Sequence, residues 1–78
     1  MRDEHKYILG RNIKAERTRK ALTQEEFAEK INMSLSHVSK IEQGLTSPTA
    51  FALYRMSVAL SVSMEEFFKG IENLEDLT

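Results

Sequence analysis

The side chains in this sequence that could do catalytic chemistry are a serine–histidine group and two pairs of glutamates. Ser36, His37 and Ser39 combine hydroxyls with an imidazole, the parts of a nucleophile and its general base. On a helix, residues one or two apart do not face each other, so this group cannot form such a pair. The glutamates at 25–26 and 65–66 suit the capping of helix starts, and no His, Asp or Glu set stands at metal-binding spacing. The sequence therefore predicts no enzyme, no catalytic residue, no cofactor and no metal site.

Hydrogen bonding to the edges of DNA bases fits the same segment better. Its exposed helix face is expected to carry Leu35, Ser36, Ser39, Lys40 and Gln43, rather than the usual mixture of glutamate and lysine. Serine is a modest helix former, so its recurrence needs a reason beyond stability. Lys40 could donate to guanine O6 or N7, and Leu35 could touch a thymine methyl. The alternative is a helix surface that has few charges by chance, and we favour base contacts by Leu35, Ser36, Ser39 and Lys40.

Two charged residues are expected on helix faces that otherwise turn inward. Arg17 follows Leu9 and Ile13 at helical spacing, and Glu42 lies four residues after Val38. A buried charge is costly unless it is paired. Each is therefore the expected partner of the other, in an ion pair that joins the first helix to the third. Arg17 could also reach a DNA phosphate.

Five helices and no strands are expected to position these residues. Three glycines and one proline are few, and no alternating apolar–polar run ends in a hairpin turn. The expected spans are about 5–20, 23–32, 34–43, 47–60 and 63–69. Capping boxes, Thr23–Glu26 and Ser63–Glu66, would begin the second and fifth helices. Asn32 and Gly44 would end the second and third, and Pro48 would lie in the first turn of the fourth.

The second and third helices are joined by only a few residues around Asn32. With the small Ala28 at their crossing they can pack closely at a steep angle. This is the helix-turn-helix arrangement, whose second helix enters the major groove of DNA. From this geometry alone, a generic helical hairpin in a small bundle is an equally good interpretation.

The length of 78 residues allows one small domain, and the absence of cysteine excludes disulfides and thiolate metal sites. No apolar run approaches a membrane span and the start lacks a signal-peptide stretch, so we expect a cytoplasmic protein without a membrane partner. The net charge of −1 hides an asymmetry, because residues 6–40 carry eight Lys/Arg against four Glu, and residues 41–78 carry two against six acidic residues. The asymmetry indicates two faces with different partners, or else an ordinary solvated charge distribution.

The run from residue 22 to 48, LTQEEFAEKINMSLSHVSKIEQGLTSP, resembles the Cro and phage-repressor type of helix-turn-helix, the xenobiotic response element family. The resemblance covers about residues 9–68 and rests on the joint spacing of Arg17, Leu22–Gln24, Phe27–Ala28, Val38–Gly44 and Pro48. It implies a compact five-helix bundle of the lambda-repressor type that binds double-stranded DNA, usually as a two-fold dimer. The single domain would span 1–78, with a core of about 8–69, a helix-turn-helix of about 23–43 and a tail of 70–78.

The resemblance also implies roles for individual residues. Leu35, Ser36 and Lys40 match positions that read bases. Gln24 would bind a phosphate at the start of the second helix, where free amides and the helix dipole favour an anion. The full set of expected phosphate contacts is Arg17, Thr23, Gln24, Ser34, His37, Thr46 and Ser47.

The sequence departs from the family pattern at the ends of the first two helices and in its charge. Ala21 stands where the family often has the glycine that ends the first helix, so this turn is expected to differ or to be slightly strained. Asn32 replaces another common glycine. On the third helix only Lys40 and His37 can be positively charged, which predicts a modest, salt-sensitive affinity for DNA.

A second apolar stripe, Phe51, Tyr54 and Val58, lies on the fourth helix outside its inward face. An ordered exposed stripe indicates an interface. Phe68 and Ile71 could extend it, so these five residues are the expected homodimer interface. The alternative is that the tail folds back on its own domain.

These features predict a sequence-specific transcriptional regulator, a repressor, that binds a palindromic operator as a homodimer through the major groove. The alternative is an antitoxin or adaptor-type protein-interaction module on the same fold. It would use the apolar stripe and the acidic tail to bind a protein partner. Alanine at Ser36 and Lys40 would separate the two, because it would weaken DNA binding and leave partner binding unchanged.

Overall fold

The computed structural model describes residues 4–71, and within this range the chain is helical and has no strand. Its α-helices are α1 (Glu4–Arg19), α2 (Gln24–Lys30), α3 (Leu35–Glu42) and α4 (Ala50–Leu60), followed by the 3-10 helix η1 (Met64–Phe68). The predicted all-α class is confirmed for these residues, but the count of five α-helices is wrong because the last segment winds as a 3-10 helix. Residues 72–78 of the expected tail lie outside the described residues.

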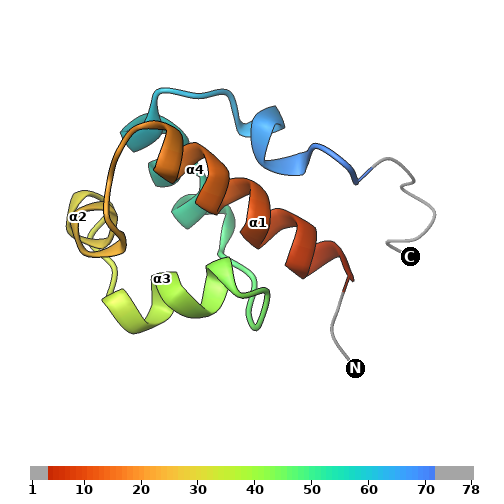
Figure 1. Cartoon of the computed structure of the whole chain (residues 1–78), viewed down its shortest axis with the longest axis horizontal. Helices are drawn as coiled ribbons and strands as arrows, with labels where there is room; N and C mark the ends of the chain where they lie inside the picture. Colours follow the sequence, from red (N-terminus) through yellow and green to blue (C-terminus); the bar gives the residue numbers. More distant parts are fainter. Residues whose placement is uncertain (1–3, 72–78) are drawn as a thin grey trace.

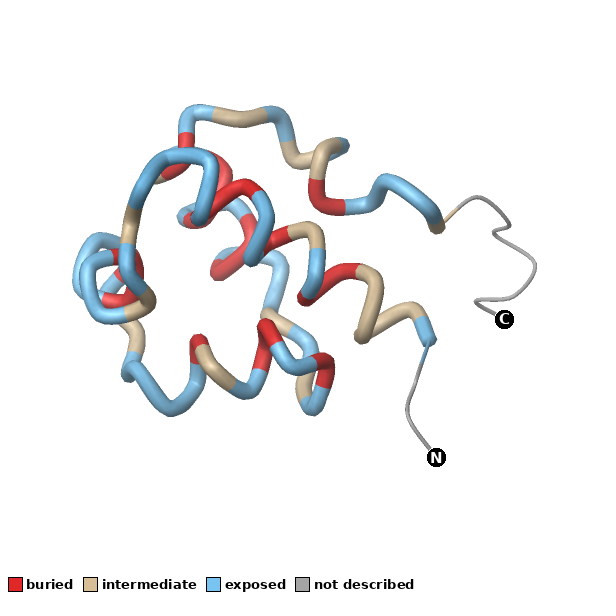
Figure 2. Tube along the Cα trace, in the orientation of Figure 1, coloured by how far each residue is buried: buried red, intermediate tan, exposed pale blue. Residues whose placement is uncertain are grey.

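The helices surround one core, with α1 running across the middle of the molecule (Figure 1). In this view α2 lies at one end, α3 lies below α1, α4 lies behind it, and η1 is near the chain end. Buried positions on each element turn inward (Figure 2). The largest fully buried side chains are Phe27, Phe67, Ile13, Ile31, Ile41, Met56, Leu60 and Val38. Within residues 4–71, no helix combines the length and apolar character that a membrane span requires.

Hydroxyl side chains cap the starts of α2, α3 and α4. At α2 the predicted capping box is present, since Thr23 Oγ1 accepts the Glu26 N–H at 3.0 Å and Glu26 Oε1 accepts the Thr23 N–H at 2.8 Å. At α4 the cap is Thr49, whose Oγ1 accepts the Ala52 N–H at 3.1 Å. The expectation that Pro48 lies in the first turn of α4 is wrong, because Pro48 precedes the cap residue.

The capping box predicted at Ser63 and Glu66 does not form. Ser63 Oγ accepts the N–H of Glu65 at 3.3 Å, because the tighter 3-10 winding brings an earlier amide to the hydroxyl. The Glu66 carboxylate instead pairs with Lys69 Nζ at 3.0 Å. The fifth element is therefore a single tight turn whose Phe67 side chain is fully buried.

A residue in the left-handed conformation follows the end of each of the four α-helices. Asn32 (φ 56°) and Gly44 (φ 79°) confirm the predicted stops after α2 and α3. Ala21 has φ 59°, so the turn after α1 carries the strain expected there. Ser61, at the end of α4, has φ 55° and was not foreseen. For a residue other than glycine this conformation costs about 1–2 kcal/mol.

Two contacts hold α1 against α3 and η1. At Gly10 a Cβ atom would overlap the Ile41 carbonyl oxygen and lie 2.9 Å from the Glu42 carbonyl oxygen, so the two backbones meet closely there. One turn of η1 is fixed by Asn12, whose Nδ2 donates to the carbonyl oxygens of Phe67 at 2.9 Å and Lys69 at 2.7 Å. These contacts set the positions of α3 and of η1 relative to α1.

Candidate nucleic-acid interface

The exposed side of α3 and the loop after it form a shallow hollow of polar side chains. Its volume is about 500 Å³, and its lining residues are Ser34, Ser36, His37, Lys40 and Thr46. Ser34 caps α3, because its Oγ accepts the His37 N–H at 3.1 Å. None of the five lining residues is acidic, so the hollow offers hydroxyl, imidazole and ammonium groups without a competing carboxylate.

Two other predicted base contacts on α3 differ in their exposure. Leu35, the first residue of the helix, is 43 % exposed although it is apolar. Ser39 is half-buried, and its Oγ accepts a hydrogen bond from Gln43 Nε2 at 2.9 Å. The structure therefore presents Leu35, Ser36 and Lys40 more openly than Ser39.

The predicted ion pair between Arg17 and Glu42 is present and anchors α3. Arg17 Nε donates to Glu42 Oε2 at 2.6 Å and Nη2 donates to Oε1 at 3.0 Å, while Nη1 donates to the Leu22 carbonyl at 2.7 Å. The residues are only 9 % and 6 % exposed. Arg17 therefore does not fit the phosphate-contact role also expected of it, because its guanidinium is buried and directed at groups inside the domain.

Gln24 joins this buried pair to the start of α2. Its Nε2 donates to Glu42 Oε1 at 2.9 Å, so one carboxylate links α1, α2 and α3. The side chain is half-buried, and this bond uses only one of the two N–H groups of Nε2. The Arg17–Glu42–Gln24 network fixes how the two helices of the helix-turn-helix cross.

The capping box of α2 lies beside Gln24 and lowers the pKa of one carboxyl group, that of Glu26. Hydrogen bonds from the Thr23 backbone N–H and then from the Thr23 side chain lower the pKa of the Glu26 carboxyl below its ordinary value. Thr23 itself is exposed at the helix start, as a phosphate contact requires, although its hydroxyl also serves the cap.

The loop after α3 holds the remaining predicted phosphate contacts. Thr46 is half-buried beside the hollow, and Ser47 is exposed. The loop is held against α1 at Gly44, where a Cβ atom would lie 2.7 Å from the Tyr7 Cα. The structure thus brings Ser34, His37 and Thr46 together and leaves Ser47 on the neighbouring surface.

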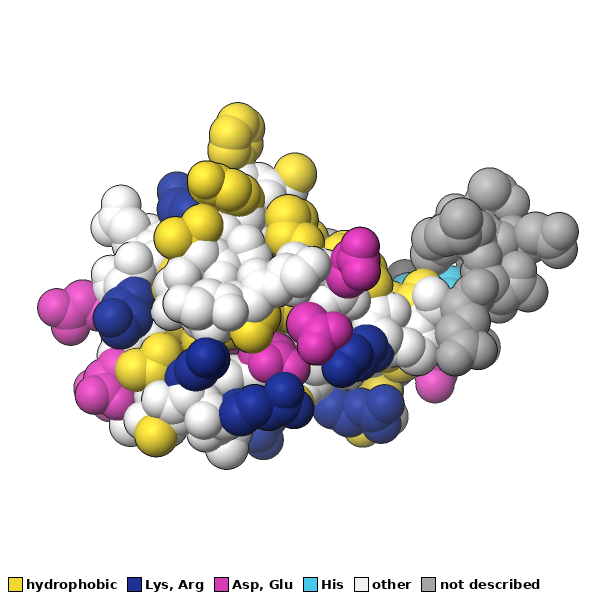
Figure 3. Space-filling view, turned by 90° about the horizontal axis from the view of Figure 1, so that it is seen from above, with side chains coloured by type: hydrophobic (Ala, Val, Ile, Leu, Met, Phe, Trp, Pro, Cys, Tyr) yellow, Lys and Arg dark blue, Asp and Glu magenta, His cyan; other side chains and the backbone are white. Residues whose placement is uncertain are grey.

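A separate apolar surface lies on α4. The three residues predicted to form the stripe are exposed: Phe51 by 80 %, Tyr54 by 59 % and Val58 by 59 %. Hydrophobic side chains protrude along one edge of the molecule, while most visible Lys and Arg side chains lie toward the opposite edge (Figure 3). Beside the stripe is an apolar hollow of about 410 Å³, lined by Ala50, Phe51, Tyr54 and Met64.

Phe68 and Ile71 were predicted to extend this stripe, and they lie at the end of η1. Phe68 is exposed and Ile71 is half-buried. The Ile71 N–H donates to the Phe68 carbonyl at 3.1 Å, and the preceding Lys69 carbonyl is bound by Asn12 of α1. Their membership of one surface with the α4 stripe stays a prediction.

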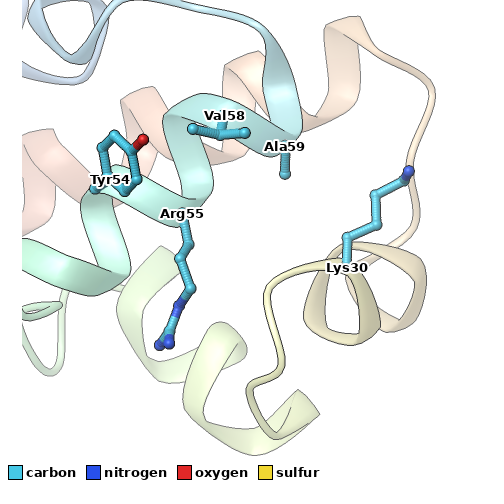
Figure 4. A pocket seen from close by; sticks show the side chains of 5 residues that line it. All are labelled: Lys30, Tyr54, Arg55, Val58 and Ala59. Atoms are coloured by element: carbon cyan, nitrogen blue, oxygen red, sulfur yellow. The ribbon is translucent and has the colours of Figure 1, made fainter.

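Sequence reasoning missed a basic pocket between α2 and α4. Lys30, Tyr54, Arg55, Val58 and Ala59 line it, with a volume of about 310 Å³ (Figure 4). Lys30 and Arg55 are distant in sequence, and only the packing of α4 against the end of α2 brings them to one pocket. The sole signal in the sequence was that Arg55 interrupts the apolar stripe of α4.

The helix α3 is exposed and polar and follows the short helix α2, and the buried Glu42 carboxylate links both to α1. This arrangement defines a helix-turn-helix protein. Residues 13–67 match the family model described as helix-turn-helix, HTH_3, and the chain belongs to this family of transcriptional regulators. It is 37 % identical over 59 residues to the HTH-type transcriptional regulator y4dJ of Sinorhizobium fredii, which covers 76 % of this chain and 77 % of that protein.

Solved structures of one regulator, SinR, are similar in fold and sequence. SinR, the master regulator for biofilm formation, crystallised in complex with DNA, matches with a TM-score of 0.72 and 33 % identity over 76 % of this chain and 95 % of that one. The complex of the SinR and SinI proteins matches with a TM-score of 0.75 and 31 % identity over 82 % of this chain and 63 % of that one.

Proposed function

We propose that this chain is a sequence-specific repressor that binds double-stranded DNA with α3 in the major groove. The observation that carries the proposal is the exposed group of Leu35, Ser36 and Lys40 beside a polar hollow without acidic lining. A hydroxyl donor, an ammonium donor and one apolar side chain suit base edges. SinR, a relative in fold and sequence, was solved with DNA bound, which supports the same use of this fold.

The proposed phosphate contacts surround this face. They are Thr23, the remaining N–H of Gln24, Ser34, His37, Thr46 and Ser47, while Arg17 positions the helices from inside. Exposed basic residues on α1 and directly after it can add charge attraction, namely Arg11, Lys14, Arg19 and Lys20. Because α3 has few cations, neutral hydrogen-bond donors would do much to position the protein on DNA. Contacts from neutral donors do not release counterions from the phosphates.

The proposal includes a homodimer formed through the α4 stripe, with residues 1–78 acting as one domain. Phe51, Tyr54 and Val58 form an exposed apolar row, and Phe68 and Ile71 are proposed to extend it. A two-fold dimer would place its α3 helices about 34 Å apart and read an approximately palindromic operator. As a DNA-binding regulator, the protein is proposed to act in the cytoplasm, where the DNA would be.

Selection of duplex DNA from a random pool, at physiological salt and read by sequencing, tests this function. We expect a two-fold symmetric site whose half-sites lie one helical turn apart. Enrichment of a single unpaired half-site would contradict the dimer alone. No enrichment by folded protein would contradict the regulator function.

A second candidate function is a protein-interaction module on the same fold, of the antitoxin or adaptor kind. The exposed α4 stripe favours it, as does the likeness to SinR in its complex with the SinI protein. Pulldown of a specific protein that still binds after Ser36→Ala and Lys40→Ala, together with no selected DNA site, would support this module over the regulator.

A further inference from the structure

The two cations of the basic pocket between α2 and α4 are not held in an ion pair by the described residues. Lys30 and Arg55 are both exposed, and among residues 4–71 neither side chain forms a hydrogen bond or an ion pair. Glu26, one turn before Lys30 on α2, interacts with Lys30 through charge, but its carboxylate accepts the Thr23 N–H at 2.8 Å and forms no ion pair with Lys30. No carboxylate lines the pocket, so its ligand has to supply negative charge.

The rest of the pocket is suited to a polypeptide rather than to a nucleic-acid backbone. Val58 and Ala59 give it an apolar part, and Tyr54 adds an aromatic ring with a hydroxyl (Figure 4). A segment that alternates carboxylates with aliphatic side chains would satisfy both parts, because apolar contact excludes water while the cations pair with acids. The polar DNA-facing hollow on α3 uses other residues.

We propose that this pocket receives residues 72–78 of a second copy of the chain. This segment reads Glu-Asn-Leu-Glu-Asp-Leu-Thr, with three carboxylates and two leucines that match two cations and an apolar floor. Tyr54 and Val58 belong to both the pocket and the α4 stripe. A partner packed on the stripe therefore brings its own chain to the edge of the pocket. The inference rests on the homodimer of the proposed function.

The position of Ile71 favours a second copy over the same chain. The residues just before it lie against residues 8–12 of α1, with the Lys69 carbonyl bound by Asn12 and Gly70 beside Ile8. Lys30 ends α2, at the opposite end of a molecule whose longest extent is 35 Å (Figure 1). An extended chain covers about 3.3–3.6 Å per residue, so Glu75 and Asp76 reach only about 13–18 Å from Ile71.

Charge reversal in the full chain, followed by sedimentation equilibrium, tests the inference. Lys30→Glu with Arg55→Glu is expected to weaken self-association about tenfold or more, and so is Glu75→Lys with Asp76→Lys. An equimolar mixture of the two variants should associate again, because each supplies the charge that the other lost. Lys14→Glu with Lys20→Glu changes the net charge equally on exposed parts outside the pocket and should leave the dimer constant unchanged.

Each other outcome overturns the inference in a distinguishable way. A wild-type dimer that neither variant weakens shows that the pocket does not hold the tail, and it leaves the homodimer and the DNA-binding function standing. Loss caused by the pocket variant alone assigns the pocket to another acid. Failure of the mixture to reassociate excludes the pairing in trans, and a monomeric wild type removes the homodimer itself.

Discussion

Arg17 donates two hydrogen bonds to the carboxylate of Glu42, from Nε to Oε2 at 2.6 Å and from Nη2 to Oε1 at 3.0 Å. This paired geometry matches the planar guanidinium to the carboxylate and is stronger than a single charged contact. Because both groups are buried, the pair connects α1 to α3 without facing solvent. Its role is to hold α3 in a fixed position against α1.

Removal of one partner of this pair should be far more damaging than removal of both. Arg17→Met leaves the Glu42 charge buried with Gln24 as a weaker partner, and it should cost about 3–5 kcal/mol in the free energy of unfolding. Arg17→Met with Glu42→Leu should recover most of that loss, because no buried charge remains. Urea unfolding followed by circular dichroism measures both. Equal destabilisation by the single and double variants would contradict the pairing account.

Gly10→Ala should destabilise the domain although alanine is the better helix former. A Cβ atom there would overlap the Ile41 carbonyl oxygen, so α1 and α3 must separate. The matched control is Ala15→Gly at an exposed position of α1, which should cost only about 1 kcal/mol through helix propensity. Thermal unfolding compares the two. A Gly10→Ala variant more stable than the wild type would show that the helices are not in contact at this point.

Single alanine substitutions on the α3 face should weaken binding to the selected operator. Ser36→Ala and Lys40→Ala should each cost about 1–3 kcal/mol for a lost base contact and relax the preference at one base pair. Lys69→Ala removes an equal charge outside α3 and should leave the base preference unchanged. Fluorescence anisotropy with operator and scrambled duplexes gives both quantities. An equal loss on the two duplexes would assign Lys40 to the phosphates.

Phe51→Asp should convert the dimer to a monomer without unfolding it. The side chain is 80 % exposed in one chain, so a charge there is hydrated until a second copy covers it. Leu45→Asp is the matched control, an exposed apolar residue outside the α4 stripe. Analytical ultracentrifugation gives the oligomeric state, and circular dichroism checks the fold. If Phe51→Asp remains dimeric, the α4 stripe is not the interface.

The start of α2 should lose stability in acid through Glu26. Its pKa is lower in the folded chain than in the unfolded chain, because the Thr23 N–H binds the carboxylate form. The contribution is therefore complete above the ordinary glutamate pKa of about 4.3 and is lost as the pH falls through the lower folded value. Glu26→Gln should flatten the pH dependence of the unfolding midpoint in this acid range. The same exchange at Glu29, near the other end of α2, should change it less.

The sequence predicted the features that depend on local pattern or on charge balance. The Thr23 capping box, the stop at Asn32 and the Arg17–Glu42 pair follow from rules that a few residues express by themselves. The winding of η1 did not, because Asn12 holds its last carbonyls from a position 57 residues away along the chain. The sequence also did not predict that Lys30 and Arg55 line one pocket, because this depends on how α2 and α4 are placed in the fold.

The left-handed residues Ala21, Asn32 and Ser61 have a consequence for how this protein can evolve and be engineered. Each occupies a backbone conformation that glycine adopts more easily, so the folded state carries strain at three connections away from the core. Natural chains often sit just above the stability that their function requires. Exposed turns such as the one at Ala21 are thus places where the lifetime of the folded protein can be lengthened without altering the surfaces proposed to contact DNA and a second copy.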